Sequence, residues 1–76
     1  MKIEVILTGP LSKYGNGSRE MMLTVTRGWT VGDLIQSLDI PDQSYSFAAI
    51  GGKKVKANDQ LSDGDIVKIF PQVSGG

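Results

Sequence analysis

The chain has 76 residues, enough for one small domain, and a domain of this size buries only about 60% of the surface that its unfolded chain exposes. Eight basic and eight acidic side chains cancel, whereas a nucleic-acid-binding domain is expected to carry a concentrated basic excess. The sequence contains neither cysteine nor histidine, which excludes disulfides, thiolate nucleophiles, histidine-based catalytic triads and nearly all zinc sites.

The first eight residues alternate between apolar and polar side chains, the pattern of a half-buried strand. The predicted inward positions are Ile3, Val5 and Leu7. Ile6 is an apolar exception on the outer face. Residues 20–27 alternate in the same way, with Met22 facing outward, and we expect the two strands to form a hairpin. Their connection, residues 9–18, has apolar residues at helical spacing, which predicts a helical turn.

A helix is predicted to begin at Thr30, because its hydroxyl can cap the first turn and Asp33 stands three residues later, as in a capping box. The apolar positions of this helix fall on a single stripe: Val31, Leu34, Ile35 and Leu38. The Ile-Pro pair at residues 40–41 is predicted to end it. A helix with one apolar stripe buries that stripe against a sheet.

Three more strands are predicted in the C-terminal half, at residues 45–50, 53–56 and 66–70. Gly51-Gly52 provides the turn between the first two. Pro71 is predicted to prevent further central-strand pairing.

The order strand, strand, helix, strand, strand, strand predicts an α+β domain at residues 1–71, with one helix packed across a mixed sheet of four or five strands. Residues 72–76 are predicted to form a flexible C-terminal tail that ends in Gly-Gly.

The only basic cluster consists of Lys53, Lys54 and Lys56, on the predicted hairpin. One interpretation is that these lysines protect a sheet edge against aggregation. The other is that they form a docking patch for an acidic partner.

Phe70 alternates out of the core on the last strand, next to Pro71 and the tail. An exposed aromatic side chain in that place predicts a partner-binding contact made by Phe70 and Pro71. Ile6 and Met22 would extend the same patch. The alternative is that these apolar residues cover a sheet edge or pack under the connection at 9–18.

The tail Val73-Ser74-Gly75-Gly76 is the strongest candidate for chemistry. Glycines let a backbone pass through a narrow enzyme channel. A terminal α-carboxyl with an ordinary pKa of about 3.3–3.7 is an anionic nucleophile at neutral pH. It can attack the α-phosphate of ATP to give an acyl-adenylate that sulfide or an amine displaces. The alternative is a frayed tail of small residues with no chemical role.

Three segments resemble the ubiquitin-like sulfur carriers, which include the small subunit of molybdopterin synthase and the sulfur carrier of the thiamine pathway. They are residues 63–71 (DGDIVKIFP), the tail at 73–76 (VSGG) and the helix entry at 29–38. The resemblance covers essentially the whole chain. It implies a β-grasp (ubiquitin-like) fold with Gly76 as the acceptor for adenylation and thiocarboxylate formation.

The same resemblance implies the partners. An adenylating enzyme of the ubiquitin-activating type would use ATP to activate Gly76, and a sulfur donor protein would convert the adenylate to a thiocarboxylate. The large subunit of molybdopterin synthase, or another acceptor enzyme, would then receive the sulfur. The chain would be a substrate of enzymes, or the non-catalytic small subunit of a synthase, and not an enzyme itself.

The connection at 9–18 and the ending at 70–74 look more like the molybdopterin branch of the family. A thiamine-pathway carrier, a protein modifier conjugated through Gly76, and an interaction domain with an inert tail stay open as alternatives. We expect the protein to be cytoplasmic and to bind no cofactor, metal or nucleic acid. We also expect it not to bind a membrane, since no apolar run is long enough to span a bilayer.

Overall fold

A computed structural model describes residues 1–15 and 17–72 of the chain. Five strands, one α-helix and two 3₁₀ helices follow one another along it. In chain order they are β1 (Lys2–Leu7), η1 (Gly9–Gly15), β2 (Glu20–Thr24), α1 (Val31–Ser37), η2 (Asp42–Ser44), β3 (Tyr45–Ile50), β4 (Lys53–Val55) and β5 (Ile66–Pro71). The predicted α+β class and the helical turn in the first connection are confirmed.

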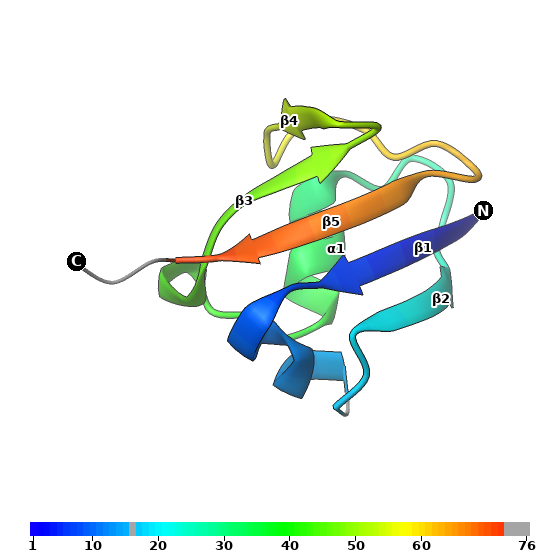
Figure 1. The fold of residues 1–76 in the computed structure, drawn as a ribbon. Helices are drawn as coiled ribbons and strands as arrows, with labels where there is room; N and C mark the ends of the chain where they lie inside the picture. Colours follow the sequence, from blue (N-terminus) through cyan, green and yellow to red (C-terminus); the bar gives the residue numbers. More distant parts are fainter. Residues whose placement is uncertain (16, 73–76) are drawn as a thin grey trace.

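The five strands form one mixed sheet in the order β2-β1-β5-β3-β4. The central pair, β1 and β5, is parallel, and the other three pairs are antiparallel. Helix α1 lies across one face of this sheet, as Figure 1 shows. On the opposite face, which we call the outer face, Met22 is 64% exposed and Ile66 is 51% exposed.

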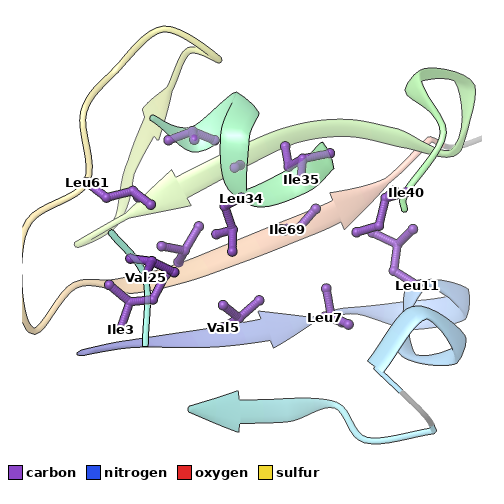
Figure 2. Packing of buried hydrophobic residues seen from close by; sticks show 13 residues of the cluster. Ile3, Val5, Leu7, Leu11, Val25, Leu34, Ile35, Ile40, Leu61 and Ile69 are labelled. Carbon is purple, nitrogen blue, oxygen red and sulfur yellow. The ribbon is translucent and has the colours of Figure 1, made fainter. Parts of the chain in front are cut away.

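Alternation along β1 puts its apolar residues into the core, as predicted. Ile3, Val5 and Leu7 are fully buried and point from β1 toward α1 in Figure 2. Leu34 of α1 meets them from the helix side and is also fully buried. The remaining buried side chains of the cluster are Leu11, Val25, Val31, Ile35, Ile40, Ala48, Leu61, Val67 and Ile69. One apolar core thus joins the helix to the sheet.

The predicted capping box begins α1. The Thr30 hydroxyl accepts a hydrogen bond from the Asp33 amide at 3.2 Å, and the Asp33 carboxylate accepts one from the Thr30 amide at 2.9 Å. The predicted helix end is wrong, because α1 ends at Ser37 and the chain turns at Asp39, which has a φ of 58°. Leu38, predicted to be buried, is the C-cap and is only half-buried.

The hairpin of β3 and β4 turns through Gly51 and Gly52, with φ values of 59° and 80°. Two successive positive φ values are the geometry of a type I′ turn, which glycine adopts without steric cost. Strand β4 is one residue shorter than predicted and ends at Val55. Strand β5 is one residue longer and includes Pro71, which lies opposite Tyr45 beyond a register shift between Tyr45 and Phe47.

Candidate functional site: the end of strand β5 and the outer sheet face

The predicted reactive tail, Val73, Ser74, Gly75 and Gly76, lies outside the described residues. The described part of the chain contains the segment that carries this tail, namely the end of β5 and Gln72. Figure 1 places that end of the sheet beside η1 and η2, and opposite the end where β1 begins.

Hydrogen bonds hold the end of β5 on both sides. On one side, Thr8 donates to the carbonyl of Ile69 through both its hydroxyl, at 2.8 Å, and its amide, at 3.2 Å. On the other side, the Gln72 amide donates to the carbonyl of Ser44 at 3.1 Å. The Ser44 hydroxyl in turn lies 3.3 Å from the hydroxyl of Tyr14 in η1. The backbone is therefore fixed as far as Gln72, one residue past the proline.

Close packing adds to these bonds at Pro71. Gly9, at the start of η1, has a φ of 56°, and a Cβ at this position would lie 3.3 Å from Cγ of Pro71. Glycine meets both requirements, the left-handed backbone and the tight approach. The connection that precedes β2 therefore packs directly against the residue that ends β5.

Phe70 and Pro71, the two residues predicted to bind a partner, occupy different surroundings. Phe70 lies on the outer face and stacks on Phe47 of β3, with ring centroids 4.6 Å apart and an interplanar angle of 19°. Pro71 packs against Gly9 and is half-buried. Phe70 presents an aromatic surface beside the tail, whereas Pro71 is mostly occupied by contacts within the domain.

A hollow of about 510 Å³ opens on the outer face next to this aromatic pair. Its apolar walls are Ile6, Ile66, Phe47 and Phe70, with Ala49 between them. Lys54 and Lys68 provide its charged side chains. Ile6, predicted to extend the patch around Phe70, therefore lies in the same hollow.

Of the three lysines clustered on the β3–β4 hairpin and just after it, one lines this hollow and two do not. Lys54 lines it, with its ammonium 5.1 Å from the centroid of the Phe47 ring. Lys53 and Lys56 are exposed and do not line it. The sheet-edge interpretation therefore fits Lys53 and Lys56 better than it fits Lys54.

Several carboxylates hold turns of the backbone. Asp63 accepts a hydrogen bond from the Lys2 amide at 2.7 Å, and Asp65 accepts one from the Ser62 amide at 2.8 Å. Asp59 accepts one from the Lys56 amide at 2.7 Å. Asp59, Asp65 and Asp33 of the capping box thus hold local turns, whereas Asp63 ties the turn before β5 to the start of β1.

Over residues 1–15 and 17–72, no group of three or more histidine, cysteine, aspartate or glutamate side chains is placed to hold a metal ion. None of the helices in this described part has the length and apolar character that crossing a membrane requires.

Sequence reasoning did not single out Phe47, Ala49 or Lys68. For Lys68 the signal was present, since alternation along residues 66–70 puts it on the face opposite Val67 and Ile69. Residues 45–50 do not alternate between polar and apolar side chains, so the outward direction of Phe47 and Ala49 could not be predicted. Which strands become neighbours is set by the tertiary fold, however, so the stacking partner of Phe70 and the hollow itself were not visible in the sequence.

Solved structures with the same fold support the architecture described above. The chain is similar to a candidate molybdopterin converting factor subunit 1 from Pyrococcus furiosus, with 24% identity, a TM-score of 0.77, and coverage of 96% of this chain and 99% of that one. It is also similar to small archaeal modifier protein 1 from Haloferax volcanii, with 22% identity, a TM-score of 0.76, and coverage of 95% and 98%.

A third similar structure is a complex of subunits 1 and 2 of the molybdopterin-converting factor from Helicobacter pylori. The identity is 20%, the TM-score is 0.66, and both chains are covered completely. At these identities the likeness establishes the fold, and the predicted β-grasp, ubiquitin-like architecture is confirmed.

The sequence itself matches the family model described as the ThiS family over residues 5–76. This match runs from β1 through every later element of the sheet to the terminal Gly75-Gly76. The predicted resemblance to the ubiquitin-like sulfur carriers is thereby confirmed, and the chain belongs to the ThiS family.

Proposed function

We propose that this protein is a sulfur carrier whose terminal Gly76 is adenylated and then converted to a thiocarboxylate. The observation that carries the proposal is the family match, which includes Gly75 and Gly76. The geometry of β5 is consistent with it, because the backbone is held up to Gln72, four residues before Gly76.

The chemistry needs an enzyme to activate the carboxylate. A Gly76 carboxylate oxygen attacks the α-phosphorus of ATP, the bond to the β-phosphate breaks, and pyrophosphate leaves. Hydrosulfide supplied by a sulfur donor protein then attacks the acyl carbon and AMP leaves, so that one carboxylate oxygen is replaced by sulfur. The chain contributes the nucleophile and its presentation, while an activating enzyme binds ATP.

In this proposal the protein is a substrate of enzymes or the non-catalytic small subunit of a synthase. Four of the eight carboxylates, those of Asp33, Asp59, Asp63 and Asp65, accept backbone hydrogen bonds and so have structural roles. The expected cytoplasmic location stays a prediction.

Within sulfur transfer, we assign the protein to molybdopterin biosynthesis. The supporting observations are the connection at 9–18, which forms η1 against Pro71, and the similarity to molybdopterin converting factor subunits. The sulfur acceptor would be the large subunit of molybdopterin synthase, with Phe70 as a contact beside the tail. A thiamine-pathway carrier is the alternative within the same family.

A second function, protein modification through Gly76, is favoured by the similarity to small archaeal modifier protein 1. Both functions start from the same acyl-adenylate, which an amine of another protein would attack in place of sulfide. The product distinguishes them, since modification yields an isopeptide bond to a lysine.

The test is intact-mass analysis of the protein after incubation with its host's activating enzyme, ATP and a sulfur donor. A sulfur carrier gains the mass difference between one sulfur and one oxygen. Protein isolated from its own host provides a second measurement: a thiocarboxylate supports the carrier, and adducts joined through Gly76 support the modifier. An unchanged mass in both measurements would contradict the proposal and favour a domain with an inert tail.

A further inference from the structure

The two edges of the sheet differ in how they are protected against pairing with another chain. Strand β4 forms one edge, and it has three residues, two of which are Lys53 and Lys54. The part of β3 that β4 leaves uncovered, residues 45–47, has a register shift. Short strands, lysines and bulges are features by which natural sheets block their edges. Strand β2, at the other margin of the sheet in Figure 1, has five residues in regular register and contains neither lysine nor proline. This second edge is therefore open to another strand.

Alternation decides which backbone groups of β2 face outward. Just beyond the strand, Met1 and Val25 exchange two backbone hydrogen bonds, at 2.8 and 2.9 Å. Every second residue from Val25 back along β2 therefore turns its amide and carbonyl toward β1, whereas Glu20, Met22 and Thr24 turn theirs away. Within the described chain, no hydrogen bond from outside the sheet reaches these outward groups. Their side chains are exposed as well.

A second copy of β2, running antiparallel, completes these hydrogen bonds in one register. When Met22 lies opposite Met22 of the second copy, Glu20 lies opposite Thr24, and Thr24 opposite Glu20. All the outward amides and carbonyls of β2 are then paired, since each such pair exchanges two N–H···O bonds. A shift by two residues leaves Glu20 or Thr24 without a partner in the other β2. A larger shift that brings the two Glu20 residues together puts like charges opposite each other, which is destabilising.

The charges on the outer face fit the same register. Lys2 is the cross-strand partner of Thr24 on β1, so the row across the interface reads Lys2, Thr24 and then Glu20 of the second copy. The two charged residues are two strand spacings apart, about 9–10 Å between Cα atoms, which long side chains can bridge over a threonine. Within one copy the cross-strand partner of Glu20 is Ile6. Self-association thus gives this carboxylate a hydroxyl and an ammonium as neighbours.

Apolar side chains meet on both faces of the joined strands. On the outer face the two Met22 side chains lie side by side at the symmetry axis, and each is largely exposed in the single copy. On the face that α1 covers, Met21 lies opposite Leu23 of the second copy. Both are only partly buried in the single copy, where they pack at the margin of the core. The pairing therefore removes apolar surface from water in addition to forming backbone bonds.

We propose that the protein self-associates as a two-fold symmetric dimer through β2, with Met22 on the axis, so that two five-stranded sheets become one continuous sheet. Because the two β2 strands run antiparallel, the two β5 strands also run in opposite directions, and their ends lie at opposite sides of the joined sheet. The contact is limited to five residues of each strand, so we expect a dissociation constant of about 10 µM to 1 mM. The inference is independent of the chemistry of Gly76.

The first test is sedimentation equilibrium of the full chain at concentrations up to about 1 mM. Met22→Lys and Met22→Glu each put like charges at the axis, and each should weaken self-association about tenfold or more. An equimolar mixture of the two variants should form a heterodimer, because lysine then lies opposite glutamate. Ile66→Lys is the matched control, since Ile66 and Met22 flank Glu4 in one cross-strand row and Ile66 lies away from the edge. It should change the dissociation constant less than about threefold.

The second test uses the absence of cysteine from the sequence to measure the register. Residues opposite each other in a hydrogen-bonded antiparallel pair have Cα atoms about 5.5 Å apart, within the range that a disulfide spans. With diamide as the oxidant, Met22→Cys should give a disulfide-linked dimer. Glu20→Cys should give one efficiently only when it is mixed with Thr24→Cys. Thermal unfolding of every variant, compared with the wild type, shows that the domain is still folded.

Three results would each overturn the inference. They are a wild type that stays monomeric at about 1 mM, a dimer that Met22→Lys leaves unchanged, and equal crosslinking of Glu20→Cys alone and in the mixture. The first of these would leave a strand of a different protein as the occupant of the edge. None of them bears on sulfur loading of Gly76, which is measured separately by intact mass.

Discussion

The amide of Gln72 donates a hydrogen bond to the carbonyl of Ser44 at 3.1 Å, across the strand end that Pro71 occupies. Proline has no amide hydrogen of its own, so this next residue makes the last backbone contact of the described chain. Ser44 is held in turn near Tyr14 of η1. The backbone is thereby held at Gln72, where the predicted tail begins.

Because the backbone is held at Gln72, the effect of the tail's length on the reaction of Gly76 can be tested. Adding one residue after Gly76 moves the carboxylate by up to about 3.3–3.6 Å, and a displacement of about 1 Å can cost on the order of 100-fold in a positioned reaction. We expect the extended protein, and one lacking Gly76, to lose ATP-dependent sulfur loading in an intact-mass assay. Thermal stability should not change. Equal loading of the extended and wild-type proteins would mean that the terminus is not the reactive group.

Phe70→Ala should weaken partner binding more than it weakens the fold. The substitution removes an aromatic contact surface of the hollow, and a central aromatic hot spot is worth about 2 kcal/mol or more, or roughly thirtyfold in affinity. The lost stack on Phe47 should cost about 0.5–1.5 kcal/mol of stability beyond the lost burial. Calorimetric titration with the partner, next to chemical denaturation, separates the two effects.

Met22→Ala is the matched control for Phe70→Ala, because Met22 is a large apolar residue on the same face but outside the hollow. It should leave both affinity and stability nearly unchanged. A fall in stability with unchanged affinity for Phe70→Ala would assign that ring to the packing of the domain alone.

Leu34→Ala should be strongly destabilising, since Leu34 is fully buried between α1 and the sheet. Truncating a buried leucine costs about 2–5 kcal/mol. A domain of this length has a total stability of only about 4–11 kcal/mol. Urea denaturation should therefore show a large drop in the midpoint, and exposed Gln36→Ala on the same helix should stay within about 0.5 kcal/mol of the wild type.

Thr30→Ala tests the capping box. It removes the acceptor for the Asp33 amide and should reduce the free energy of unfolding by about 0.5–2 kcal/mol. Thr26→Ala, at an exposed position before the helix, is the control. Similar losses for the two variants would show that the measured effect is not capping.

Local patterns predicted the parts of this fold that depend on neighbours in sequence. Alternation identified the buried face of β1, and Thr30 with Asp33 identified the start of α1. The end of α1 was wrong because Asp39 turns the chain in a left-handed conformation that its residue type only weakly signals. Leu38 is only partly buried, though it still packs against the core, and Ile40, expected only to end the helix, is buried in the core.

The candidate site shows the same division. The tail stays a prediction, and the outward direction of Phe70 was predicted from sequence alone. The hollow was not, because it depends on β5 lying between β1 and β3, and therefore on pairings between residues far apart in the chain. The role of Gly9 against Pro71 depends on the same long-range arrangement.

The parallel pairing of β1 with β5 has a consequence for how the protein is made. The partner of Glu4 on β5 is Ile66, close to the other end of the sequence, so the centre of the sheet cannot form while the chain is still short. Pairing between such distant segments is slow compared with local structure. A nascent chain that stops before Ile66 therefore has neither a folded domain nor a tail.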